Sequence, residues 1–163
     1  YLNPVLQFDI EKFCEAAARV GIDGIILPDL PMYEFETEYQ QIFKKYNLKF
    51  IFLVTPETSE ERIRKTDKLS SGFLYAVSSS STTGNTKVLE DTHNEQETYL
   101  KKLQDMKLTN PVLAGFGIKD KNTFDTACIH TQGAIIGSDF INVLKSSSNL
   151  TQPSKVFINN NKV

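Results

Sequence analysis

Short apolar runs alternate with helix-like segments along the chain, and this alternation restricts its fold more than any other feature. The run at residues 49–56 is continuously apolar, which is typical of a parallel strand covered on both faces. Strands that are each followed by a helix predict an α/β fold with a parallel sheet. About five such strands are expected, at residues 24–28, 49–56, 72–78, 111–117 and 133–138.

The segments between the runs have helical periodicity and recognisable ends. Residues 9–19 carry apolar side chains at three- and four-residue spacing, with Asp9 as the expected N-cap and Gly21 as the expected stop. Thr58 and Glu61 have the spacing of a capping box. The stretch that opens at Tyr1 is expected to leave a strand. Further helices are expected at residues 33–45, 58–70, 94–106, 120–130, 139–147 and 152–163.

Two architectures use this alternation, a doubly wound sheet and a (β/α)8 TIM barrel, and both place functional residues at the carboxyl ends of the strands. A barrel needs eight strands and ~250 residues. A chain of 163 residues with about five parallel strands and flanking helices would therefore be an incomplete portion of a barrel. Because the chain opens at Tyr1 rather than at an initiator Met, we expect it to be a fragment.

Composition argues against several classes of function. Lys and Arg number 18 against 20 Asp and Glu, a net charge of −2 that argues against a nucleic-acid or anionic-membrane surface. The apolar runs are far shorter than the ~20 residues of a membrane span. Cys14 and Cys128 form neither a metal-binding spacing nor a disulfide framework. We expect a cytoplasmic protein without a nucleic-acid or membrane partner.

Glycines end two successive strands, and a helix-like segment follows each. A phosphate dianion is well held by backbone N–H groups at a helix N-terminus, and glycine lets the backbone approach it closely. Gly117, Gly137 and Ser138 are therefore candidates for a phosphate site, in which Asp139 would have to face outward. The alternative is that these glycines only end strands.

Other candidates lie at the same strand ends. The polar loop at residues 78–86 is long enough to be an active-site lid, with Gly84 as a hinge or a further phosphate donor. The alternative is a disordered surface loop. Asp29 is a candidate general base or orienting group. The alternative is that it caps or braces the following helix. Phe116 is available to stack on a flat ligand or to pack in the core. His93 and His130 have no triad-like spacing and are expected at the surface.

Taken in order, several motifs resemble the tryptophan synthase alpha subunit family. They read "YLNP", "GIDGIILPDLP", "KFIFLVTP", "FLYAVSSSSTTG", "PVLAGFGI" and "GAIIGS", and together they cover nearly the whole chain. The resemblance implies a (β/α)8 barrel that cleaves indole-3-glycerol phosphate by a retro-aldol step into indole and glyceraldehyde 3-phosphate, in tryptophan biosynthesis. It implies a heterotetramer with a beta subunit that carries pyridoxal phosphate, and no cofactor in this chain.

The resemblance also implies roles for individual residues. Asp29 would be a supporting residue, and Thr83 in the lid would contact the catalytic aspartate on closure. The phosphate would be held by Gly84, Gly117, Gly137 and Ser138, and the indole pocket would be lined by Phe116 and Tyr75, with Tyr1 and Ile26 nearby.

The sequence departs from the family in what it lacks. The family's acid–base glutamate and its indole-binding aspartate are expected upstream of Tyr1, so residues 1–163 would be the C-terminal part of a single TIM-barrel domain, strands four to eight, and inactive alone. Two alternatives stay open. One is another phosphate-binding barrel, such as indole-3-glycerol phosphate synthase or a histidine-pathway isomerase, although the strand ends here offer no lysine. The other is a non-catalytic module that binds a phosphorylated ligand.

Overall fold

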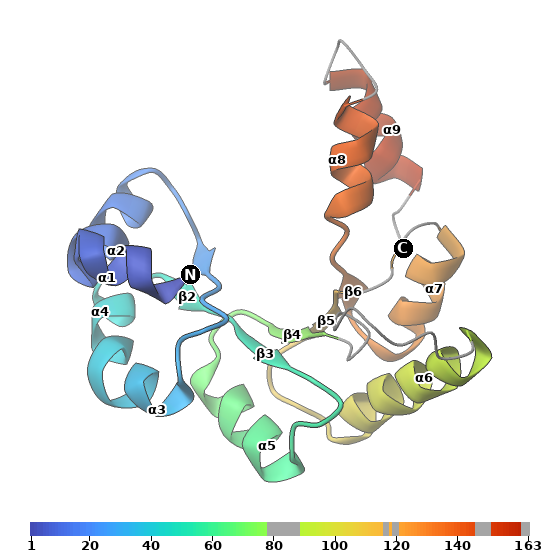
Figure 1. Cartoon of the computed structure of the whole chain (residues 1–163), viewed down its shortest axis with the longest axis horizontal. Helices are drawn as coiled ribbons and strands as arrows, with labels where there is room; N and C mark the ends of the chain where they lie inside the picture. Colours follow the sequence, from blue (N-terminus) through green and yellow to red (C-terminus); the bar gives the residue numbers. More distant parts are fainter. Residues whose placement is uncertain (78–88, 116–117, 119–120, 146–150, 161–163) are drawn as a thin grey trace. The chain divides into compact units, whose positions relative to one another are not determined.

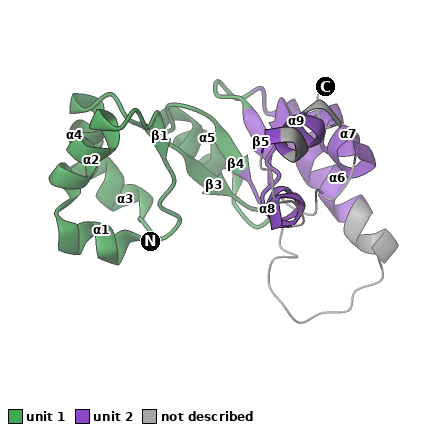
Figure 2. Cartoon of the chain, turned by 90° about the horizontal axis from the view of Figure 1, so that it is seen from above, with its two compact units in different colours: residues 1–75, 108–111 green, residues 76–107, 112–163 purple. Residues whose placement is uncertain are grey.

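The computed structural model describes residues 1–77, 89–115, 118, 121–145 and 151–160 of the chain (Figure 1). Contacts between residues divide the chain into two compact units, each of which is described by itself (Figure 2). Unit 1 comprises Tyr1–Tyr75 and Leu108–Pro111, and unit 2 comprises Ala76–Lys107 and Val112–Val163. That residues 1–163 belong to a single barrel domain stays a prediction.

Unit 1 alternates helices with short strands. Its strand β1 pairs in parallel with β2, with Gly24 opposite Lys49 and Ile25 opposite Phe50. The N–H of Ile51 extends this pairing by donating to the carbonyl of Ile25 at 3.0 Å. In chain order its elements are α1 (Leu2–Phe8), α2 (Ile10–Arg19), β1 (Gly24–Ile25), α3 (Met32–Glu34), the π-helical turn η1 (Phe35–Tyr39), α4 (Gln40–Lys45), β2 (Lys49–Phe50), β3 (Phe52–Val54), α5 (Glu60–Leu69) and the start of β4 (Leu74–Ala76).

Unit 2 continues the alternation. Its strands β5 and β6 pair in parallel, with Leu113 opposite Gly133 and Ala114 opposite Ala134. Helices α8 and α9 lie side by side in Figure 1, and the ring centroids of Phe140 and Phe157 are 5.4 Å apart. After the end of β4, the elements are α6 (Leu89–Asp105), β5 (Val112–Ala114), α7 (Lys121–His130), β6 (Gly133–Ala134), α8 (Ser138–Lys145) and α9 (Thr151–Asn160). The predicted parallel strands with intervening helices are confirmed.

The core of unit 1 is built around phenylalanine rings. Phe35 stacks on Phe50 with 4.2 Å between ring centroids and meets the edges of Phe43 and Phe52 at 5.6 and 5.2 Å. All four side chains are buried. Burial of a phenylalanine side chain stabilises a fold by about 1.5–3 kcal/mol, and aromatic pairs add to this. This cluster fixes helices α3 to α4 against strands β2 and β3.

The predicted strand at residues 49–56 is interrupted at Ile51. The carbonyl of Phe50 accepts hydrogen bonds from the N–H of Ser71 and the hydroxyl of Ser70, both at 3.2 Å, and the Ser71 hydroxyl accepts the N–H of Phe50 at 3.1 Å. These serine contacts take up polar groups of Phe50 that would otherwise be free for a strand ladder.

Three local predictions are wrong. The stretch after Tyr1 forms helix α1, because Pro4 falls in its first turn, where a helix does not need the missing N–H. The N-cap of α5 is Ser59, whose hydroxyl accepts the N–H of Arg62, whereas the Thr58 hydroxyl accepts the N–H of Thr55. Helix α6 begins at Leu89 rather than at residue 94. The predicted cap of α2 is confirmed, since Asp9 accepts the N–H groups of two residues in its first turn.

Candidate functional site

Two residues of the predicted phosphate site lie at the start of helix α8. Gly137 precedes the helix, Ser138 is its first residue, and both are exposed. The carbonyl of Gly137 accepts the N–H of Ile141 at 3.1 Å, which closes the first turn. The first N–H groups of a helix lack intrahelical acceptors and carry partial positive charge. A Cβ built on Gly137 would meet no atom of the described residues within 4 Å. This helix start therefore has room and donors for an anion.

Asp139 lies in the first turn of α8 and is half-buried. A carboxylate at this position stabilises the helix dipole but repels a phosphate that shares the same N–H groups. That Asp139 faces away from the anion stays a prediction.

Asp29 anchors a helix. Both of its carboxylate oxygens accept the N–H of Leu2, at 2.9 and 2.8 Å. Leu2 is the first residue of α1, so the carboxylate satisfies one of the N–H groups that a helix leaves free at its start. Of the two alternatives, the bracing role is therefore the one observed. The helix is α1, which precedes Asp29, and not the following helix that the sequence suggested.

Two proposed indole-pocket residues lie near this anchor in the chain. Tyr1 immediately precedes the anchored Leu2 and is 84% exposed, and Ile26 directly follows β1 and is 39% exposed. Tyr75 occupies the middle of β4 and is half-buried between two buried neighbours, Leu74 and Ala76. Because side chains alternate along a strand, Tyr75 points to the face opposite these two.

Several predicted residues lie outside the described part of the chain. They are Thr83 and Gly84 in the proposed lid, and Phe116 and Gly117 in the predicted phosphate and indole sites. The side chain of His93 also lies outside it. Gly115 directly precedes Phe116 and is described. Its N–H donates to the carbonyl of Ala76 at 2.9 Å. That N–H therefore serves the sheet and is not a phosphate donor.

The prediction that His130 is a surface residue is wrong. Its side chain is only 13% exposed and lies between helices α6 and α7. Its Nδ1 is 2.9 Å from Gln104 Oε1, and its Nε2 is 3.8 Å from Glu97 Oε1 and has no hydrogen-bond partner among the described residues. Its place at the end of a helix suggested exposure because a local pattern does not show the packing of a neighbouring helix.

Sequence reasoning also missed Asp67, a carboxylate on α5 that is only 6% exposed. Burial raises the pKa of this carboxyl group. Hydrogen bonds donated by the backbone N–H groups of Thr109 and Asn110 lower it by more, so the pKa lies below its ordinary value. The available signal was its helical position, four residues after the buried Ile63. Helix periodicity alone places Asp67 on the buried face.

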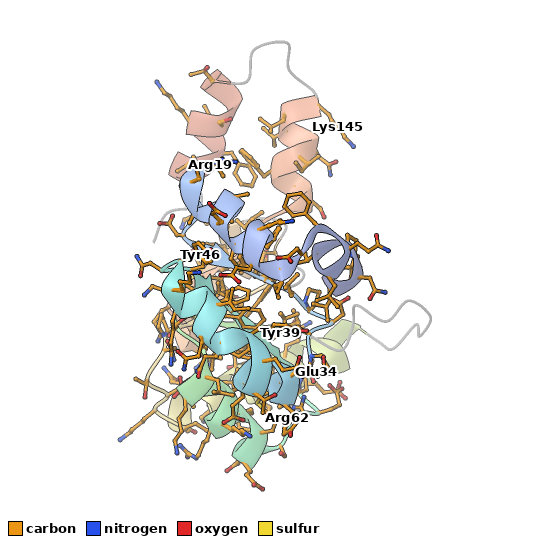
Figure 3. All side chains as sticks on the ribbon, turned by 90° about the vertical axis from the view of Figure 1, so that its left-hand side faces the viewer. Arg19, Glu34, Tyr39, Tyr46, Arg62 and Lys145 are labelled. Carbon is orange, nitrogen blue, oxygen red and sulfur yellow. The ribbon has the colours of Figure 1, made fainter. Side chains whose placement is uncertain are left out.

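The charged groups of unit 1 are otherwise mainly at its surface. Lys45 at the end of α4 pairs with Glu11 of α2. The hydroxyl of Tyr46, which is labelled in Figure 3, lies 3.4 Å from the same glutamate oxygen. The hydrogen bond from Lys45 and its charge lower the pKa of Glu11. Because both side chains of the ion pair are about half exposed, the pair contributes little to stability.

The described residues contain neither a metal-binding cluster nor a helix able to cross a membrane. No group of three or more His, Cys, Asp or Glu side chains in this part of the chain is arranged to hold a metal ion. None of its helices combines the length and the apolar character that a membrane crossing requires.

Comparison with solved structures identifies the fold. The tryptophan synthase A-subunit from the hyperthermophile Pyrococcus furiosus superposes with a TM-score of 0.77 at 24% sequence identity, over 98% of this chain and 62% of that one. The tryptophan synthase a2b2 complex from the same organism gives a TM-score of 0.78 at 24% identity. The parallel α/β fold with flanking helices is therefore the barrel fold of these neighbours, of which this chain is an incomplete portion.

Comparison of sequences identifies the family. The tryptophan synthase alpha chain of Bacteroides thetaiotaomicron is 48% identical over 145 residues, which cover 89% of this chain and 56% of that protein. The corresponding chain of Flavobacterium johnsoniae is 49% identical over 147 residues, or 90% of this chain and 57% of that protein. This chain thus spans little more than half the length of these relatives. The family model for the tryptophan synthase alpha chain matches residues 1–162, and the chain belongs to that family.

Proposed function

We propose that this chain is the C-terminal portion, strands four to eight, of a tryptophan synthase alpha subunit. The complete subunit would cleave indole-3-glycerol phosphate by a retro-aldol step into indole and glyceraldehyde 3-phosphate. Family membership over residues 1–162 carries the proposal. The order of the motifs, from "YLNP" to "GAIIGS", supports the C-terminal placement.

Within the reaction, this chain supplies substrate binding. The open, exposed start of α8 at Gly137 and Ser138 supports a role in holding the phosphate. Gly84 and Gly117 would add backbone N–H groups, and Thr83 would contact the catalytic aspartate when the lid closes. The indole ring would lie against Phe116 and Tyr75, with Tyr1 and Ile26 nearby.

The bond cleavage itself requires two proton transfers. The indole must gain a proton at C3 as its bond to the glycerol chain breaks, and a hydroxyl of that chain must lose one. Each transfer needs a group within about 2.6–3.2 Å of its proton. Asp29 is engaged by the N–H of Leu2, which supports an anchoring rather than a proton-transfer role. We place the acid–base glutamate and the indole-binding aspartate upstream of Tyr1, so the chain alone binds substrate without turning it over.

The proposed partner is a tryptophan synthase beta subunit in a cytoplasmic heterotetramer. The likeness to the Pyrococcus furiosus a2b2 complex supports this partner. Pyridoxal phosphate would belong to the beta subunit, and this chain would need no cofactor of its own.

The test uses the purified chain and two variants of one residue. Gly137→Asp and Gly137→Asn both provide good helix N-caps, and only the first adds a negative charge. We expect the wild-type chain to bind indole-3-glycerol phosphate in calorimetry without consuming it. Gly137→Asp should weaken binding at least about tenfold relative to Gly137→Asn, because the carboxylate repels the phosphate.

Turnover is measured with and without a co-expressed polypeptide that corresponds to strands one to three of a relative. Indole should form only when both parts are present. Formation of indole by the chain alone would refute the predicted inactivity. Equal binding by both Gly137 variants would refute the phosphate site.

A further inference from the structure

A short segment of the chain belongs to a different unit from the residues on either side of it. Leu108–Pro111 is part of unit 1, whereas Ala76–Lys107 before it and Val112–Val163 after it are part of unit 2. A segment of four residues is too short to bury a core of its own. Its attachment to unit 1 therefore needs specific contacts.

Asp67 of α5 supplies these contacts. Its Oδ2 accepts the N–H of Thr109 at 2.8 Å, and its Oδ1 accepts the N–H of Asn110 at 2.9 Å. The side-chain amide of Asn110 donates to the same Oδ1 at 2.9 Å and to the backbone carbonyl of Asp67 at 2.6 Å. One buried aspartate thus binds two successive residues that lie 42 and 43 positions further along the chain.

The carboxylate is held as an anion by neutral donors. In the described part of the chain, its hydrogen bonds come from the backbone N–H groups and the polar side chains of Thr109 and Asn110. A buried carboxylate without a cation depends on all of its hydrogen bonds. Removal of the charge should therefore release both residues together.

The two residues held by Asp67 come directly before strand β5. The carbonyl of Pro111 accepts the N–H of Leu74 at 2.8 Å, and the N–H of Gly115 donates to the carbonyl of Ala76 at 2.9 Å. These hydrogen bonds fix the two ends of β5 beside β4. A slip of one residue would turn every β5 side chain to the opposite face.

We propose that Asp67 is a latch that sets the register of β5 and thereby positions Gly115, at the carboxyl end of that strand. The register role rests on the contacts above. The importance of this register for ligand binding rests on the proposed function, because the residues after Gly115 are those expected to bind substrate. Asp67 is a positioning residue and does not itself contact substrate.

The test replaces Asp67 with asparagine, which has the same shape. Its side-chain NH2 would face an N–H of Thr109 or Asn110, so one donor would lose its acceptor. Asp125→Asn is the matched control, because Asp125 is an exposed carboxylate paired with Lys121 on α7. Asn110→Ala is a milder second variant that keeps both backbone contacts and serves if Asp67→Asn folds poorly.

The readout is amide hydrogen exchange in the whole chain without ligand. In Asp67→Asn we expect exchange at Leu74, Thr109, Asn110 and Gly115 to accelerate about tenfold or more, whereas the amides of α2 change less than about twofold. Asn110→Ala should give a smaller acceleration at the same amides, and Asp125→Asn none. Uniform acceleration that includes α2 would overturn the latch, because it indicates general loss of stability. Unchanged exchange would overturn it as well.

Binding of inorganic phosphate to the folded variants tests the positioning role. Weaker binding by Asp67→Asn than by Asp125→Asn supports it, and equal binding overturns it. If the wild-type chain binds no phosphate, the proposed function fails, while the exchange pattern still decides for or against the latch.

Discussion

The rings of Phe35 and Phe43 meet edge to face with centroids 5.6 Å apart, although eight positions separate them in one helical stretch. In a regular α-helix, eight positions leave two side chains about 80° apart around the axis. The π-helical turn Phe35–Tyr39 accommodates one extra residue, so the same eight positions rotate only as far as about seven. Both rings therefore face Phe50.

Deletion of one exposed residue from this turn should be tolerated. Without Thr37 the stretch can form a regular α-helix, in which the seven remaining positions still bring Phe35 and Phe43 to one side. We expect the free energy of unfolding, measured with urea, to fall by no more than about 1.5 kcal/mol. Phe35→Ala should cost about 3–5 kcal/mol. A deletion as costly as Phe35→Ala would contradict this account of the turn.

Alanine substitutions at two glycines should differ in effect. At Gly24 a new Cβ would lie 2.8 Å from Ile51 Cδ1 and 3.1 Å from the backbone oxygen of Lys49, which cannot move without shifting β2. Gly24→Ala should therefore lower the free energy of unfolding by about 1–3 kcal/mol. The new Cβ of Gly137→Ala meets none of the described residues within 4 Å, so this variant should stay within about 0.5 kcal/mol of wild type. Thermal unfolding of the two variants side by side checks this, and equal losses would contradict it.

Asp67 should make the chain sensitive to acid. Its folded-state pKa lies below the ordinary value of 3.8, so its contribution to stability is complete well above that pH. The contribution is lost as the pH falls through the lower folded-state pKa. The difference in free energy of unfolding between wild type and Asp67→Asn should therefore be constant near neutral pH and shrink below about pH 4. Urea titrations across this range measure it, and a constant difference would contradict the prediction.

The two thiols should react in a fixed order. Cys14 is fully buried, and burial raises its pKa to about 11, with the nearby Glu11 adding to the effect. Cys128 is half-buried, and its pKa is also raised, first by burial and then by Asp125. Because the thiolate is the reactive form, iodoacetamide at pH 8 should modify Cys128 well before Cys14. Timed peptide mass analysis follows both sites, with urea-unfolded chain as the control in which they react alike.

Local signals predicted the elements whose causes are local. Asp9 caps α2 because its side chain reaches N–H groups two and three residues later. The sequence pointed to Thr58 rather than Ser59 as the cap of α5, although both residue types can cap a helix. The outcome depends on the hydrogen bond from the N–H of Thr55 to the Thr58 hydroxyl, which the pattern does not show. Helix α1 was missed because a single proline, here Pro4, occurs both after strands and in the first turn of helices.

The site was predictable to the same extent. Gly137 before α8 and Ser138 at its first position indicated an open helix start, which the structure has. The partner of Asp29 lies 27 positions earlier and those of Asp67 lie 42 and 43 positions later, so neither contact leaves a trace in local spacing. Long-range partners of this kind become visible only when the chain is folded.

The division of unit 1 between two stretches of sequence has a consequence for biosynthesis. Residue 75 leaves the ribosome 36 residues before residue 111, since 111 − 75 = 36, and unit 1 contains both. At about 5–20 residues per second, the nascent chain would wait about 2–7 s for its last segment. During that interval the carboxylate of Asp67 faces water instead of its partners. Completion of the first unit is therefore timed by the translation of helix α6.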